Sequence, residues 1–279
     1  MSESPPPEGP SLDAPSLKAR REPIFNIPTV VIALLAVLIG AYAAFSAVSP
    51  DTQDAVLRLF AFQPLRLTLA ISPDRFAALL AKVNTDSEAY TEATLIRQHG
   101  VALWTILTYA FLHGSWTHVI LNSVWLLAFG PPVARRFGAS RFLVFFAFTA
   151  AAGALTHWAF YASDFTPLVG ASAADSGMMG AATRFVFQSG AALGSLDGHS
   201  LSERQSLDNV PAPGLLQLLR QRRPVIFIAI WMATNFLFGA SAQTLGASEA
   251  PVAWLAHVGG FLAGLIAFPL FDRKRPQSA

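Results

Sequence analysis

Long runs of uncharged, mostly apolar residues alternate with short charged stretches along this chain. The 28 residues 23–50 carry no charge, and a dense apolar run covers 30–48 within them. A helix that crosses the hydrocarbon core of a bilayer needs about 20 residues without costly charge. The pattern therefore predicts a first membrane span in this run.

Five further stretches fit the same rule. The uncharged run 98–134 is too long for one span, and Gly114-Ser115 offers a break with a serine suited to cap a helix. We expect the second span at about 115–132, with 101–113 as an interfacial segment outside it. Asp175 and Arg184 interrupt the fourth stretch. The other spans are expected at 142–163, at about 168–188, between Arg223 and Glu249, and at about 252–271.

These elements predict an all-α polytopic membrane protein, a bundle of six transmembrane helices over residues 23–271. An outer loop of about 51–113 and a cytoplasmic loop of about 191–223 would interrupt the bundle. Residues 1–22 are rich in Pro and Ser and read as a disordered cytoplasmic tail, and 272–279 as a second tail. The first run could instead be a signal peptide, but its apolar part exceeds the usual 7–15 residues.

Basic residues fix the predicted orientation. Thirteen of the 19 Lys and Arg lie before the first span, after the sixth, and in alternate loops between them. Alternate loops of a six-span protein lie on one side of the membrane, and the side richer in Lys and Arg is the cytoplasmic one. Both termini are therefore expected in the cytoplasm.

Composition narrows the class of protein. Hydrophobic residues make up 53% and charged residues 13%, which argues against a soluble, disordered or fibrous chain. The net charge of +2 gives no basis for a nucleic-acid partner. Cysteine is absent, which excludes disulfides, thiolate metal sites and a cysteine nucleophile. Any nucleophile must therefore be oxygen or nitrogen.

Polar side chains within the spans are functional candidates by default, because lipid makes them costly. His118 and Asn122 are four residues apart and share one face of the second span. His257 stands on one stripe with Gly260 and Gly264, a surface suited to close contact with another helix. Hydrogen bonding between helices is the plainer explanation for His118 and Asn122.

Ser172 lies at the start of the fourth span, which carries two stripes of small residues at four-residue spacing. Such stripes let a helix approach its neighbours closely, so a central position is expected, and a lone serine there is usually structural. Counted from the outer side, Ser172 and His257 differ by only about 3 Å in depth. The two side chains are therefore plausible partners.

Three motifs together make residues 100–271 resemble the rhomboid family of intramembrane serine proteases. They are Gly170-x-Ser172 opening a helix, Ala256-His257-x-x-Gly260-x-x-x-Gly264, and His118-x-x-x-Asn122, with Gly130 … Arg135-Arg136-Phe137-Gly138 as a further likeness. The resemblance implies that Ser172 is the nucleophile and His257 its general base. It also implies an oxyanion hole formed by His118, Asn122 and the backbone N–H of Ser172.

The resemblance further implies cleavage of single-span or membrane-anchored proteins in or near their spans. No metal or organic cofactor is expected, and the implied location is a bacterial cytoplasmic membrane. Serine needs a hydrogen-bonded base, and His suits that role near neutral pH. Asn amide, imidazole N–H and helix N-terminal amide groups can stabilise the negative charge of a carbonyl under attack.

The chain departs from the family pattern at three places. Ala173 replaces the usual glycine after the nucleophile, Asp175 replaces an apolar residue, and Thr105 follows Trp104 where the family commonly has a basic residue. Asp175 supports two readings. It is a third triad-like partner of His257, or a protonated or water-facing carboxyl without a direct role, and we favour the latter.

The other polar candidates rank lower. We expect His113 to help hold the outer entrance and Ser176 to lie within reach of the imidazole, while Trp231 and Asn235 read as packing of the fifth span. His157 reads as structural, and His99 and His199 as loop residues.

Two other functions stay open from sequence. One is a catalytically inactive rhomboid-like protein that binds transmembrane helices, for which Ala173 is the only argument. The other is a small transporter or channel, although the cluster of His, Asn and Ser lies near one face and does not continue through the bilayer.

Overall fold

The computed structural model describes residues 27–81, 90, 94, 100, 102–188, 211–241 and 253–272. Its regular structure within these residues is helical, apart from one isolated bridge between Phe62 and Leu168. The helices are α1 (Thr29–Ser46), α2 (Pro50–Phe60), α3 (Pro64–Ile71), α4 (Pro73–Leu80), α6 (Thr105–Thr108), the 3-10 helix η1 (Tyr109–Phe111), α7 (Trp116–Phe137), α8 (Ala139–Phe160), α9 (Ser172–Thr183), α11 (Leu215–Leu218), α12 (Arg222–Ser241) and α13 (Trp254–Phe271).

Four of the described helices, α1, α7, α8 and α13, are long and apolar enough to cross a membrane. They correspond to the first, second, third and sixth predicted spans, which confirms the prediction of a helical integral membrane protein. The predicted cap is also present, because the Ser115 hydroxyl accepts a hydrogen bond from the backbone N–H of His118 at 3.1 Å. Residues 1–22, most of the loop 191–223 and residues 273–279 lie outside the described residues.

The fourth predicted span is wrong in its extent, since α9 has 12 residues and is about 18 Å long. The chain before it is extended, with Leu168 bridged to Phe62. Gly170 then has φ +114°, a backbone conformation that only glycine adopts without strain. The helix therefore begins at Ser172, four residues later than the apolar run. The fifth predicted span overlaps α12, which is not among the four helices named above.

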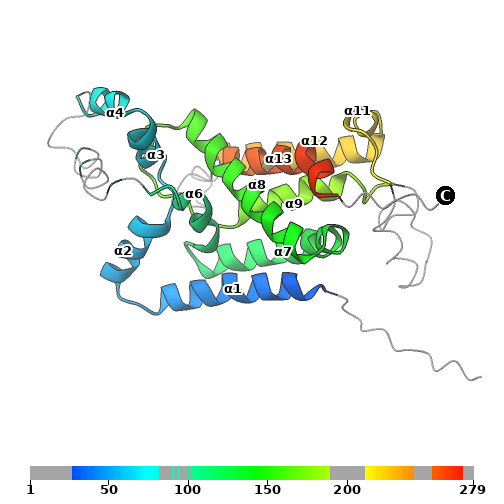
Figure 1. Cartoon of the computed structure of the whole chain (residues 1–279), viewed down its shortest axis with the longest axis horizontal. Coiled ribbons are helices and arrows are strands. Elements are labelled where there is room, and N and C mark those ends of the chain that lie inside the picture. Colours follow the sequence, from blue (N-terminus) through cyan, green and yellow to red (C-terminus); the bar gives the residue numbers. More distant parts are fainter. Residues whose placement is uncertain are drawn as a thin grey trace, which may run out of the picture.

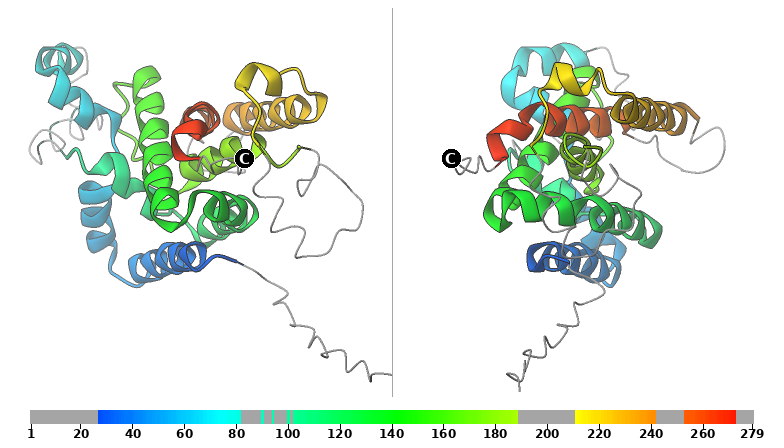
Figure 2. Two further views of the ribbon diagram at one scale, coloured as in Figure 1. Left: turned by 45° about the vertical axis from the view of Figure 1, so that its right-hand side comes forward. Right: turned by 90° about the vertical axis from the view of Figure 1, so that its right-hand side faces the viewer.

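The helix α9 lies inside the bundle and packs against α7, α8 and α13 (Figure 1). In Figure 2, α1 and α12 lie on opposite sides of this centre in both views. Glycines permit the tightest contacts: a Cβ added to Gly260 would meet the carbonyl of Ala173, and one added to Gly264 would meet that of Gly177. The backbones of α9 and α13 are thus in direct contact, as the small-residue stripes predict.

A glycine on α8 makes room for Ala173. A Cβ added to Gly153 would lie 2.5 Å from the Ala173 Cβ and 2.7 Å from the Ala256 carbonyl oxygen. Ala173 stands where the rhomboid family usually has glycine. Its extra methyl group fits here because Gly153 has no side chain to fill the same space.

Gly153→Ala is expected to lower the free energy of unfolding by about 1–3 kcal/mol, because the added methyl overpacks this contact. In Gly153→Ala/Ala173→Gly the clash with Ala173 disappears and the clash with the Ala256 carbonyl remains, so stability should recover in part. Chemical unfolding in mixed micelles measures both. Equal instability of the single and double variants would show that Ala173 does not use this space.

Residues 61–68 are docked on the connection between α8 and α9. The backbones of Phe62 and Leu168 exchange two hydrogen bonds, of 3.2 and 2.8 Å. The Thr68 hydroxyl donates to the Ala162 carbonyl at 2.6 Å and accepts from the indole N–H of Trp158 at 2.9 Å. This segment, together with α2, α3, α4 and α6, gathers at one end of the bundle (Figure 1). The region expected as an outer loop therefore contains helices and supports the entry into α9.

The buried Arg184, which the sequence alone does not explain, hydrogen-bonds to a backbone carbonyl of α13 that lacks its helical partner. Pro269 has no N–H, so the carbonyl of Leu265 lacks its partner one turn later in the helix. The Arg184 guanidinium donates to this carbonyl at 3.0 Å and to the Pro213 carbonyl at 2.7 Å. An N–H group of Arg184 thus takes the place of the backbone N–H that Pro269 lacks.

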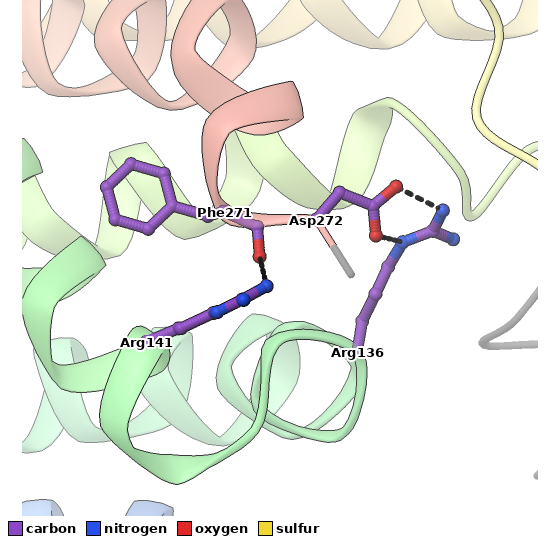
Figure 3. Close-up of polar contacts among 4 residues, drawn as sticks. All are labelled: Arg136, Arg141, Phe271 and Asp272. Atoms are coloured by element: carbon purple, nitrogen blue, oxygen red, sulfur yellow. Dashed lines mark hydrogen bonds and ion pairs between the residues drawn. The ribbon is translucent and has the colours of Figure 1, made fainter. Parts of the chain in front are cut away.

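The C-terminal end of α13 is hydrogen-bonded to side chains of α7 and α8 (Figure 3). Arg136 donates two hydrogen bonds of 2.8 Å to the carboxylate of Asp272, and Arg141 donates to the Phe271 carbonyl at 3.4 Å. The Arg136 guanidinium also lies 4.7 Å from the ring centre of Phe185. A bidentate Arg–carboxylate pair fixes geometry as well as charge, so the end of α13 is held against α7.

Candidate active site

Ser172 is the first residue of α9 and stands where the chain turns into the helix. Gly170 supplies the turn, and its N–H donates to the Tyr109 carbonyl at 3.0 Å. The first N–H groups of a helix have no partner within it, so those near Ser172 are available to an oxyanion. Ser172 is itself half-buried.

His257 lies on the first turns of α13 and faces Ser172. Its Nε2 is 2.8 Å from the Ser172 Oγ, and its Nδ1 is 2.8 Å from the Oδ1 of Asn235 on α12. The contact between Gly260 and the Ala173 carbonyl brings the two helices close enough for the first of these hydrogen bonds. The two side chains predicted as a pair are therefore brought together by backbone packing.

His118 and Asn122, on one face of α7, lie over Gly170. A Cβ added to this glycine would lie 2.6 Å from the His118 Nε2 and 3.3 Å from the Asn122 Nδ2. Both nitrogens are thus close to the backbone two residues before Ser172. This placement suits two donors aimed at the oxygen of a carbonyl attacked by Ser172.

His113, in the connection before α7, holds the amide of Asn122. The Asn122 Nδ2 donates to the His113 Nε2 at 3.0 Å, and the His113 and His118 rings are 5.1 Å apart edge to face. Burial lowers the pKa of His113 to about 4, and the nearby His118 adds to the shift. The ring is therefore neutral at pH 7, and its Nε2 can accept. The second N–H of the Asn122 amide makes no hydrogen bond to any residue that the structure describes.

Asp175 makes no hydrogen bond to His257, so its interpretation as a third triad member is wrong. Its side chain is 2% exposed, and neither carboxyl oxygen hydrogen-bonds to any residue that the structure describes. The Nδ1 of His257 is taken by Asn235 instead. Nor is the Asp175 carboxyl water-facing, because it is buried in the bundle.

Three lower-ranked residues have plain structural contacts. Ser176 donates to the Ser172 carbonyl within α9 at 2.8 Å, so its hydroxyl bonds to backbone, and it makes no hydrogen bond to the imidazole among the described residues. Trp231 stacks on Phe261 with ring centres 4.2 Å apart, as expected of packing. His157 lies 5.1 Å from the Tyr161 ring and 4.0 Å from the Asp164 carboxylate.

The expectation that Asn235 only packs within the fifth span is wrong, because its amide hydrogen-bonds to His257. The only clue in the sequence was a single amide side chain within an apolar stretch. The sequence alone could not show that α12 packs beside the imidazole on α13. His99 and His199 lie outside the described residues. In the described part of the chain, no three His, Asp or Glu side chains form a metal-binding group.

The family model of the rhomboid domain matches residues 101–273, which include α7, α8, α9, α12 and α13. A search among curated proteins finds no match. Because the rhomboid domain covers more than half of the chain, the protein belongs to the rhomboid family.

Proposed function

We propose that this integral membrane protein is an intramembrane serine endopeptidase that hydrolyses peptide bonds of membrane-anchored proteins. One observation carries the proposal: the Ser172 Oγ lies 2.8 Å from the His257 Nε2, on two helices whose backbones touch. A nucleophile within hydrogen-bond reach of a base that is oriented by a third group is the arrangement nucleophilic catalysis requires.

In the first half of the reaction, the Ser172 oxygen attacks the substrate carbonyl carbon while its proton passes to the His257 Nε2. The resulting imidazolium gives that proton to the leaving amine as the C–N bond breaks. A water molecule then attacks the acyl ester and gives a proton to the same nitrogen, which returns it to the Ser172 oxygen as the ester C–O bond breaks and the acid leaves. His257 thus serves as base and acid in turn.

His118, Asn122 and the N–H of Ser172 would stabilise the tetrahedral intermediate. The amide of Asn122, the imidazole of His118 and the N-terminus of α9 all lie around Gly170. Removing one such donor from a serine protease typically lowers kcat about 10²- to 10³-fold. These donors act in a protein interior, where their effect exceeds that in water.

The remaining elements fit six spans, with α9 and α12 as the fourth and fifth. Both termini would then lie in the cytoplasm, with Ser172 and His257 near the outer side of a bacterial cytoplasmic membrane. The substrates would be single-span or membrane-anchored proteins that expose an extended strand to Ser172. The surrounding lipid bilayer is the second partner.

The test is cleavage of a panel of single-span model proteins by the purified chain in liposomes, with fragments identified by mass spectrometry. The control is the same preparation treated first with a serine-reactive fluorophosphonate. Cuts in or beside the span that disappear after treatment would support the proposal. No cut in any substrate, together with no fluorophosphonate on Ser172, would overturn it in favour of a rhomboid-like protein that only binds transmembrane helices.

Asp175→Asn is expected to keep kcat within about threefold of the wild type, because the carboxyl contacts neither His257 nor any other described polar group. The amide keeps the size of the side chain and removes its ionisation. Cleavage rates of one model substrate over a pH series measure the effect. A loss of several hundred-fold would show that the carboxyl acts in the reaction.

A further inference from the structure

Asn235 stands on α12 with both ends of its amide hydrogen-bonded. Its Nδ2 donates to the Trp231 carbonyl one turn earlier at 2.9 Å, and its Oδ1 lies 2.8 Å from the His257 Nδ1. A backbone carbonyl only accepts, so the nitrogen of the amide must face Trp231. The oxygen therefore faces the imidazole.

This orientation determines which nitrogen of His257 carries the proton. An amide oxygen accepts and does not donate, so the Nδ1 must be the N–H of the neutral ring. The Nε2 then has a free lone pair directed at the Ser172 hydroxyl, 2.8 Å away. A general base needs that tautomer, because the other one would present an N–H to the nucleophile.

No other described group makes this contact. Among the described residues, His257 hydrogen-bonds to Ser172 and Asn235, the nearby Ser176 donates to the Ser172 carbonyl, and the Asp175 oxygens bond to no described residue. The tautomer of the base thus depends on one residue from a third helix.

Two aromatic contacts hold Asn235 at the required place. One turn before it, Trp231 stacks on Phe261 of α13 with the rings 17° from parallel. Directly after it, Phe236 meets Trp254 of α13 edge to face, with ring centres 5.9 Å apart. These contacts lie on both sides of Asn235 along α12 and tie it to the helix that carries His257.

We propose that Asn235 is a positioning residue that completes a Ser172–His257–Asn235 triad. It holds the Nδ1–H tautomer of the neutral imidazole and accepts the same hydrogen bond from the imidazolium that forms during the reaction. The inference deepens the proposed protease function and rests on it for its effect on rate, but the tautomer itself does not depend on proteolysis.

The kinetic test compares Asn235→Leu and Asn235→Ala with Asn235→Asp. Leu and Ala remove the acceptor, and kcat is expected to fall about 10- to 100-fold with KM nearly unchanged, because Asn235 acts on the reaction through the tautomer of His257. Asp restores an acceptor of the same size and should return kcat to within about threefold of the wild type. Thr234→Ala is the matched control: its hydroxyl donates only to the Ile230 carbonyl of its own helix, and it should behave as wild type.

Nitrogen-15 NMR of histidine-labelled protein in bilayers gives a second readout, with His257→Gln to assign the signals. The wild type should show one neutral tautomer with the proton on Nδ1, and Asn235→Leu and Asn235→Ala a mixture of two. The Nδ1–H tautomer persisting in both variants, or a kcat unchanged in both, would overturn the inference. A wild type that cleaves nothing yet shows this tautomer change would instead contradict the protease function while supporting the role of Asn235.

Discussion

Ser172→Ala is expected to lower kcat/KM for a single-span model substrate by at least about 10,000-fold, and His257→Ala to do nearly the same. Without Ser172 no ester with the substrate can form. Without His257 the hydroxyl keeps its proton and is a weak nucleophile at neutral pH. Cleavage by the purified, reconstituted variants measures both losses.

The double variant Ser172→Ala/His257→Ala should be no slower than either single variant, because the two groups act as a unit. Ser176→Ala is the matched control, since this serine lies one turn further along the same helix and bonds only to backbone. It should cleave at nearly the wild-type rate. Substantial cleavage by Ser172→Ala, or losses that multiply in the double variant, would exclude the pair as nucleophile and base.

Gly260→Leu is expected to destroy the contact between α9 and α13. The new side chain would meet the Ala173 carbonyl, which is backbone and has little room to move. Overpacking typically costs about 1–3 kcal/mol and exceeds this where backbone must shift. We expect a large loss of unfolding free energy and loss of fluorophosphonate labelling of Ser172, because the His257 imidazole would move away from the hydroxyl.

Gly40→Leu is the matched control for this substitution. Gly40 lies within α1, and a Cβ there would meet nothing within 4 Å. The variant should unfold and label like the wild type in the same micelles. If Gly260→Leu also labels normally, direct backbone contact between α9 and α13 is not what places Ser172 beside His257.

The sequence predicted those features that depend on hydropathy and on spacing within one helix. The spans at α1, α7, α8 and α13 follow from uncharged runs, and the stripe of His257, Gly260 and Gly264 predicted close packing. His118 and Asn122 were placed on one face by their spacing, and the structure puts both above Gly170. Periodicity suffices for such features because each is local.

The features that sequence reasoning missed depend on contacts between distant segments. Hydropathy does not register the strand-like pairing of Leu168 with Phe62, so the start of α9 was expected too early. Arg184 interrupts an apolar run. Its partner is the Leu265 carbonyl, which lacks a helical donor because of Pro269, 85 residues further along the chain. Asn235 acquires its role only when α12 is placed against α13.

Residues 61–68 dock on the connection before α9, although they lie outside the part of the chain that matches the family. Family resemblance begins at residue 101, whereas the hydrogen bonds of Phe62 and Thr68 to that connection lie before it. A fragment cut at 101 would leave the carbonyls of Ala162, Asp164 and Leu168 without their donors at the entry to α9. The part of the chain that holds the start of α9 in place is therefore longer than the part that matches the family, because residues 61–68 supply hydrogen bonds to its entry.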